Sequence, residues 1–212
     1  MAILEELSEA VQSGNRKSVV ELTQQAIDDG MDVKVILDEG LISAMTIIGD
    51  KFSRNEVFVP EMLVAARAMT AGTEVLKPYL VESGSEPLGH ACIGTVKGDM
   101  HDIGKNLVRM MIEGKGIEIT DMGVDVQPEA FVDYLKEHPE CNLVCLSALL
   151  TTTLPMIPGT IKAIEEAGLR DRVKVMIGGA PVSQEFADEV GADAYTADAG
   201  SASTKAAELL SA

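Results

Sequence analysis

The chain has 212 residues, of which 46% are hydrophobic and 24% are charged, and this composition excludes a disordered or collagen-like protein. Asp and Glu number 34 against 17 Lys and Arg, and the resulting net charge of -17 repels nucleic-acid phosphates and anionic membrane surfaces. We therefore expect neither a nucleic-acid partner nor a membrane partner.

The start of the chain and the cysteines indicate a compartment. No apolar run reaches the roughly 18 residues that a membrane span requires, and the start MAILEELSEA has glutamates where a signal peptide has basic residues. The three cysteines, Cys92, Cys141 and Cys145, are odd in number and lie in apolar runs, which favours buried free thiols over disulfides. We expect a cytoplasmic protein.

The first 82 residues show the apolar periodicity of helices. The pattern predicts helices over 3–11 and 19–26, a third over 33–52 with a kink near Gly40, and a fourth from Pro60 to about Tyr79. Four helices with short connections predict a small bundle. The polar stretch 83–87 then predicts a linker between a helical domain, 1–82, and a second domain, 88–212.

The second domain alternates short apolar runs with helical patterns. Strands are predicted over 89–96, 117–121, 142–147, 173–177 and 193–196, and helices near 104–115, 128–138, 156–168, 183–190 and 201–211. This alternation is typical of a flavodoxin-like (Rossmann-type), doubly wound, five-stranded parallel sheet, so the whole chain is α/β with an N-terminal helical bundle. Ligands bind such sheets beyond the carboxyl ends of the strands, which here are followed by the loops 98–104, 121–125, 147–153, 178–181 and 197–200.

The first of these loops places His101 between Asp99 and Asp102, just before a predicted helix. Taken alone, the loop fits a solvated polar turn in which an Asp or Asn caps the helix. A phosphate-binding loop is disfavoured, because five residues instead of four separate Gly98 from Gly104 and Asn106 stands where Ser or Thr would hold magnesium.

A metal site with a single protein ligand is the other interpretation of this loop. One ring nitrogen of His101 would bind the metal, and Asp99 would hold the other nitrogen. The remaining histidines, His90 and His138, are predicted to be polar surface residues. Because one histidine cannot hold a bare ion tightly, a metal bound here should arrive already chelated.

Three motifs together resemble the signature of cobalamin-binding domains of the methionine synthase type. They are Asp99-Met-His101-Asp102-Ile-Gly104-Lys-Asn106, Ser147-Ala-Leu149 and Gly178-Gly179. The helical part, with Gly49-Asp-Lys-Phe52 and Val57-Phe-Val-Pro60-Glu-Met62, resembles the helical cap of the same proteins. A cap and a corrinoid domain without a catalytic barrel look like the free-standing corrinoid proteins of methylotrophic methyltransferase systems.

The resemblance implies a cofactor and its site. The cofactor would be cobalamin or a related corrinoid, methylcobalamin in the loaded state, with His101 as the axial ligand of cobalt. Asp99, His101 and Thr153 would form a ligand triad, in which threonine replaces the serine of the methionine synthases. Further cofactor contacts are implied for Asp102, Gly104, Ser147, Leu149, Thr151, Gly178 and Gly179, and apolar cover for Phe52, Val59 and Met62. For Val59 and Met62, a place in the bundle core is an equally good interpretation.

The implied function is that of a methyl carrier, a non-catalytic subunit of a multi-component system. A substrate-specific methyltransferase would load a methyl group from methanol, a methylamine or a betaine onto cobalt(I). A second methyltransferase would pass it to tetrahydrofolate or a thiol, and a reductive activator would restore oxidised cofactor. The alternatives are a cobalamin-dependent sensor, which the acidic composition disfavours, a mutase subunit, which usually lacks this cap, and a flavodoxin-like domain without a corrin.

Overall fold

The computed structural model describes residues 2–83 and 87–211. Its contacts divide the chain into two compact units, Met1–Pro87 with Gly114–Gly116, and Leu88–Glu113 with Ile117–Ala212. Of the predicted linker 83–87, residues 84–86 lie outside the described part. Among the described residues, no helix is both long enough and apolar enough to cross a membrane.

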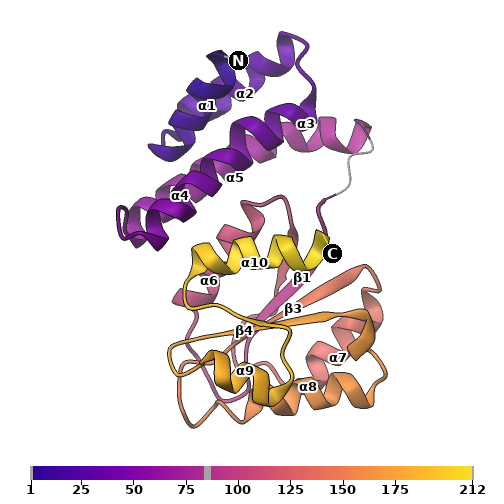
Figure 1. The fold of residues 1–212 in the computed structure, drawn as a ribbon. Helices are drawn as coiled ribbons and strands as arrows, with labels where there is room; N and C mark the ends of the chain where they lie inside the picture. Colours follow the sequence, from indigo (N-terminus) through magenta and orange to yellow (C-terminus); the bar gives the residue numbers. More distant parts are fainter. Residues whose placement is uncertain (1, 84–86, 212) are drawn as a thin grey trace. The chain divides into compact units, whose positions relative to one another are not determined.

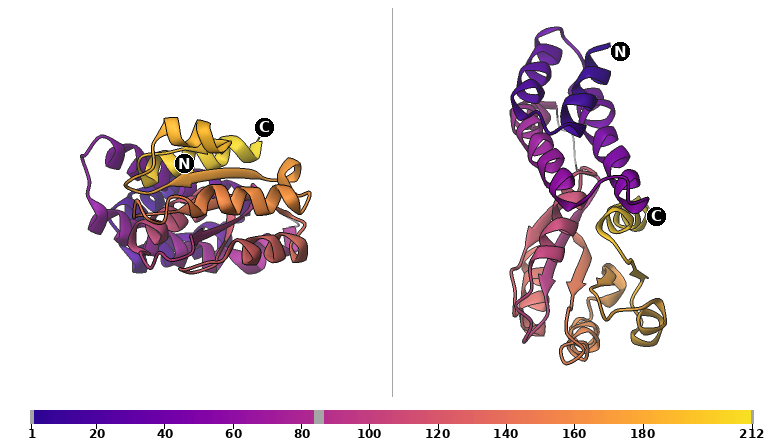
Figure 2. Two further views of the ribbon diagram at one scale, coloured as in Figure 1. Left: turned by 90° about the horizontal axis from the view of Figure 1, so that it is seen from below. Right: turned by 90° about the vertical axis from the view of Figure 1, so that its left-hand side faces the viewer.

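The first unit is helical. It consists of α1 (Ala2–Gln12), α2 (Arg16–Asp28), α3 (Val33–Val35), the π-helical segment η1 (Ile36–Ile42), α4 (Ser43–Ser53) and α5 (Val59–Ser83). Figure 2 shows these helices running alongside one another, and their inward faces bury side chains such as Leu7, Val19, Leu41 and Met62 completely. Since α3, η1 and α4 follow one another directly, the unit has the four helical segments that the periodicity predicts.

Gly40 lies within η1, where the sequence predicts a kink. A Cβ atom at this position would lie 2.7 Å from a methyl carbon of Leu7, so glycine lets α1 pack against the segment. The chain does not break here. It widens into π-helical geometry, and the Ser43 N–H donates to the carbonyl of Asp38, five residues earlier.

The second unit is an α/β sandwich. Its strands are β1 (His90–Thr95), β2 (Glu118–Asp121), β3 (Cys141–Ser147), β4 (Lys174–Gly178) and β5 (Ala194–Tyr195). They form one parallel sheet in the order β2-β1-β3-β4-β5. The helices are α6 (Ile103–Glu113), α7 (Pro128–Glu137), α8 (Met156–Glu166), the short 3-10 helix η2 (Arg170–Arg172), α9 (Gln184–Val190) and α10 (Ala199–Ser211). The predicted doubly wound fold is confirmed.

Helices cover both faces of this sheet (Figure 1). Successive residues of a strand face opposite sides, so Cys92 and Val144 pack toward α7, α8 and α9, while Ile93 and Cys145 pack toward α6 and α10. With both faces buried, the strands are nearly continuous apolar runs, which is why the sequence predicts them well.

The strand register aligns the carboxyl ends of the three central strands. Thr95 at the end of β1 pairs with Ser147 at the end of β3, and Ser147 pairs with Gly178 at the end of β4. The loops that follow these strands therefore start side by side at one edge of the sheet. This edge is where the sequence places its three motifs.

The adjacent Gly178 and Gly179 have different structural roles. Gly179 has a φ of +128°, and a Cβ atom there would lie 1.8 Å from the carbonyl oxygen of Ala148. Glycine is thus required for the β4 loop to pass the β3 loop. At Gly178 the nearest atom to a Cβ would be the carbonyl oxygen of Thr196 at 3.6 Å, an ordinary contact.

This contrast predicts opposite effects on stability. Gly179→Ala should lower the free energy of unfolding by at least about 2 kcal/mol, because the clash is with backbone and the conformation disfavours a side chain. Gly178→Ala should change it by less than about 1 kcal/mol. Urea unfolding of both variants without ligand measures this, and an equal loss in both would contradict the assignment.

Candidate functional site

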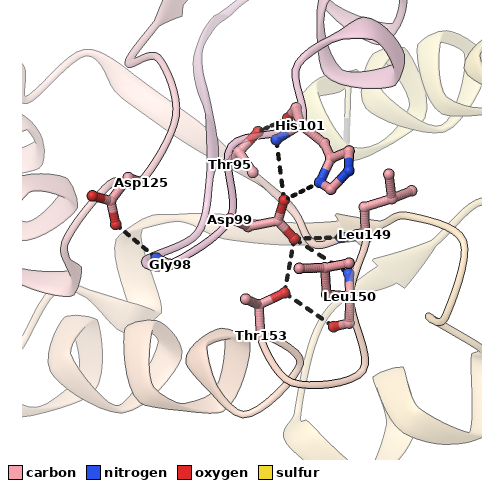
Figure 3. Close-up of polar contacts among 8 residues, drawn as sticks. All are labelled: Thr95, Gly98, Asp99, His101, Asp125, Leu149, Leu150 and Thr153. Carbon is pink, nitrogen blue, oxygen red and sulfur yellow. Dashed lines mark hydrogen bonds and ion pairs between the residues drawn. The ribbon is translucent and has the colours of Figure 1, made fainter.

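His101 lies in the loop between β1 and α6, at the carboxyl edge of the sheet (Figure 3). Its side chain is 50% exposed, and its ring Nδ1 lies 2.7 Å from Oδ1 of Asp99. Its backbone is also held, because the hydroxyl of Thr95 donates to the His101 carbonyl at 2.7 Å. The loop therefore holds the Nδ1 edge of the imidazole against Asp99 and leaves half of the side chain exposed to solvent.

Asp99 is completely buried and accepts five hydrogen bonds. Oδ1 accepts from the backbone N–H of His101 at 3.1 Å and from the His101 ring. Oδ2 accepts from the hydroxyl of Thr153 at 2.7 Å and from the N–H groups of Leu149 and Leu150 at 2.8 and 3.3 Å. One carboxylate thus joins the β1 loop to the β3 loop, as Figure 3 shows.

These contacts set the protonation state of Asp99. Burial raises its pKa, but the hydrogen bonds from Leu149, His101 and Thr153 together lower it by more. The net effect holds the pKa of Asp99 well below its usual range, so the carboxylate is ionised at neutral pH.

The ionised carboxylate in turn selects the His101 tautomer. A carboxylate accepts hydrogen bonds but donates none, so in the neutral imidazole Nδ1 must carry the hydrogen. The lone pair of neutral His101 is therefore on Nε2, on the side of the ring away from Asp99. This is the tautomer that a metal bound through Nε2 requires.

The structure brings most of the other predicted residues to the same edge. Thr153 is buried against Asp99, and Leu149 contributes its N–H to Asp99 and an exposed side chain. Ser147 is half-buried at the end of β3, while Thr151 and Asp102 are exposed in the adjoining loops. The cofactor contacts of these residues stay predictions.

Sequence reasoning missed two contributors to the site. Leu150 donates its N–H to Asp99, and Thr95 anchors the His101 carbonyl. Backbone donors carry no residue signature, and Thr95 ends a buried strand where its hydroxyl gives no pattern. The roles of Leu150 and Thr95 become visible only in the structure, where the β1 and β3 loops lie next to each other.

The edge around His101 fits a large, partly apolar ligand. Four large apolar side chains in the two loops and at the start of α6 are exposed, Met100 by 69%, Ile103 by 79%, Leu149 by 39% and Leu150 by 41%. A Cβ atom at Gly104 would meet no atom within 4 Å, so the protein itself has room there for a side chain. These features suit the corrinoid that the sequence motifs imply, because a flat macrocycle would cover the apolar groups and use the free space.

The side chains that the structure describes do not form a simple metal site. Among the described residues, no group of three or more His, Cys, Asp or Glu side chains is arranged to hold an ion. Cys92, Cys141 and Cys145 are buried free thiols, as predicted.

The predicted cap residues differ in exposure. Phe52 and Val59 are half-buried, whereas Met62 is fully buried in the helical unit, the location that the core interpretation gives it. Phe58, which the sequence places in the same motif, is 65% exposed. The available signal for Phe58 was an aromatic residue two positions before Pro60, in a chain with few aromatics.

The hydrogen bonds to Asp99 predict a pH-dependent stability. Asp99→Asn should cost about 1–3 kcal/mol near neutral pH, because its amide NH₂ would face groups that are themselves donors. The ionised carboxylate contributes fully to the free energy of unfolding at pH values above the ordinary pKa of Asp. This contribution declines as the pH falls from there toward the lower pKa that Asp99 has in the folded state. The stability difference between parent and variant should therefore narrow below about pH 4.

Asp102→Asn is the matched control. Asp102 is an exposed carboxylate in the same loop, and it accepts from the Asn106 side chain at 3.2 Å. This variant should stay within about 0.5 kcal/mol of the parent. Thermal unfolding of the ligand-free proteins across pH provides the measurement, and a constant difference for Asp99→Asn would refute the argument.

Comparison with known families agrees with this geometry. Residues 89–207 match a family model described as a B12 binding domain, and residues 3–77 match a second model with the same description. The first match alone covers more than half of the chain. It spans the sheet and all the loops around His101.

Similar proteins extend the match over the whole chain. Dimethylamine corrinoid protein 1 of Methanosarcina acetivorans is 43% identical, with 98% of this chain and 97% of the relative covered. A cobalamin-binding protein of Desulfitobacterium hafniense has a TM-score of 0.82 at 29% identity, covering 97% of this chain and 98% of that one. A methanol:cobalamin methyltransferase complex of Methanosarcina barkeri has a TM-score of 0.85 at 26% identity, covering 99% and 80%. The chain therefore belongs to the B12-binding corrinoid proteins of methyltransferase systems, and its cofactor is cobalamin.

Proposed function

We propose that this chain is a cytoplasmic methyl carrier that works between two methyltransferases. The observation that carries the proposal is the Asp99–His101 pair, which leaves Nε2 of an exposed imidazole free at the carboxyl edge of the sheet. The likeness to corrinoid proteins over nearly the full length of the chain supports it. The chain contributes the cofactor site, and its partner enzymes contribute substrate recognition.

When bound, cobalamin supplies a cobalt centre that accepts a methyl group and gives it up again. His101 would hold that metal through Nε2, and Asp99 would keep the ring oriented by accepting from its Nδ1–H. Thr153 would keep the Asp99 carboxylate in place through its 2.7 Å hydrogen bond.

The proposed methyl donor is a methylamine, with dimethylamine as the first compound to test. Support comes from the 43% identical relative, which is named a dimethylamine corrinoid protein. The donor would be bound by a separate methyltransferase. A second methyltransferase would deliver the methyl group to a thiol or to tetrahydrofolate, and a reductive activator would rescue oxidised cofactor.

For the cap, we propose Phe58 as an apolar contact for the cofactor in addition to the predicted Phe52. The support is exposure, since Phe58 exposes 65% of its surface while Met62 exposes none. Phe58 also lies between Phe52 and Met62, in the segment that resembles the cap of the cobalamin-binding proteins. Met62 is better explained as a core residue of the helical unit.

The first experiment tests cofactor ligation. Purified protein is incubated with hydroxocobalamin, desalted and examined by absorption spectroscopy beside His101→Ala. The parent should retain the corrin with a nitrogen-ligated spectrum, and His101→Ala should lose that ligation. Gly178→Ala serves as a second probe, because it should retain less corrin although its fold is unaffected. A colourless parent protein would refute the proposed function.

The second experiment tests the donor. Reduced, cofactor-loaded protein is mixed with a dimethylamine-specific methyltransferase and radiolabelled dimethylamine, then desalted. Label should remain with the parent protein and be absent when cofactor is omitted. Labelled monomethylamine and methanol, each with its own methyltransferase, are the comparison. Equal labelling from all three would contradict a dimethylamine-specific role, and no labelling from any would contradict the carrier role.

A further inference from the structure

We propose that the segment Asp121–Asp125, here named the clamp loop, positions His101 for metal ligation by holding residues 98–105 near both ends. The inference rests on the proposed function, in which His101 is the cobalt ligand. Neither acidic residue of the clamp loop is part of the sequence motifs that identify the cofactor site. Both act on the backbone and helix that carry His101.

The clamp loop is anchored to the end of β1. The N–H of Thr95 donates to the carbonyl of Gly123 at 3.0 Å, and the N–H of Val126 donates back to the carbonyl of Thr95 at 3.0 Å. Val96 and Val126 form an isolated parallel bridge. The pairing of β1 with β2 thus continues past the strand end, and it fixes the clamp loop beside the start of the His101 loop.

Asp125 forms the first contact of the clamp. Its backbone N–H donates to the carbonyl of Asp99 at 2.9 Å, and its Oδ1 accepts from the N–H of Gly98 at 2.6 Å (Figure 3). Asp125 has a φ of 53°, a left-handed conformation that few residues other than glycine adopt and that Asp and Asn tolerate best. One residue therefore holds two peptide groups shortly before His101, through the Gly98 N–H and the Asp99 carbonyl.

Asp121 forms the second contact. Its Oδ1 lies 2.5 Å from Nζ of Lys105, whose side chain is only 2% exposed. Lys105 lies in the first turn of α6, four residues after His101. Because an ammonium group buried this deeply needs its partner, the ion pair fixes the start of α6 to the end of β2.

These contacts bear on ligation because a histidine ligand must be placed within a fraction of an ångström to bind its metal well. Asp99 fixes the rotation of the His101 ring, but Asp99 itself sits on the backbone that Asp125 holds. Loosening that backbone should leave the Asp99–His101 pair intact and weaken its alignment with the metal. Asp121 and Asp125 are accordingly positioning residues.

The test measures how fast His101 is displaced from bound cofactor. Protein loaded with hydroxocobalamin is mixed with excess cyanide, and the spectrum follows formation of the dicyano form, which requires His101 to leave the cobalt. Asp125→Gly removes the hydrogen-bond acceptor but still permits the left-handed backbone conformation. Asp125→Ala removes the acceptor and also disfavours that conformation. Each should speed displacement about tenfold, as expected for loss of one charge-assisted hydrogen bond.

Two control variants, Asp125→Asn and Asp133→Ala, separate positioning from a loss of charge. Asp125→Asn keeps an acceptor oxygen and tolerates the left-handed backbone, so its rate should lie within about twofold of the parent. Asp133→Ala removes an exposed carboxylate on α7, whose ion pair with Lys136 is 3.9 Å long, and should also match the parent. Asp121→Asn should speed displacement in the same direction as Asp125→Gly.

The outcomes distinguish the clamp from the proposed function. Rates for Asp125→Gly and Asp121→Asn equal to the parent rate, in proteins where His101→Ala reacts faster than the parent, would overturn the clamp alone. Equal rates for the parent and His101→Ala would overturn both the ligand assignment and the clamp. Faster displacement of His101 in Asp125→Gly, together with a rate like the parent's in Asp125→Asn, would support positioning by the hydrogen bond.

Discussion

The site depends on one buried carboxylate that has enough donors to remain charged. A carboxylate taken out of water without partners would become protonated, and a protonated Asp99 would no longer be restricted to accepting hydrogen bonds. Five donors from two loops prevent this. Its charge then dictates which nitrogen of His101 carries the hydrogen, and so which nitrogen is free for the cofactor. The tautomer of an exposed histidine is thus determined by a carboxylate in the protein interior.

The parallel sheet makes this arrangement available. Asp99 and Thr153 are 54 residues apart in sequence, and they meet because β1 and β3 are neighbours whose carboxyl ends are in register. Gly179 allows the β4 loop to approach Ala148 closely, so the third loop starts beside the first two. The same topology explains why ligand sites on such sheets recur at this edge, whatever residues the loops carry.

Much of the fold could be predicted from the sequence, because both periodicities are strong here. Strands buried on both faces, such as β3, are continuous apolar runs, and helices such as α7 begin at a proline and bury one stripe. The π-helical geometry of η1 could not be predicted, since apolar spacing does not distinguish a π-helical turn from a kinked α-helix at Gly40. Periodicity also could not separate Met62 from Phe58, because it identifies an apolar residue without showing whether packing buries it or leaves it exposed.

The same limit applies to the site. His101, Asp99 and Thr153 stand out in the sequence because the roles predicted for them need particular side chains. The structure brings the three together, and their roles toward the cofactor stay predictions. Leu150 contributes only a backbone N–H, which every residue but proline has, so no residue type signals it. Asp125 is an intermediate case, because its side chain matters but its partner is the backbone N–H of Gly98. Positioning residues that hold backbone will in general be less visible in sequence than ligands, although the ligand geometry depends on both.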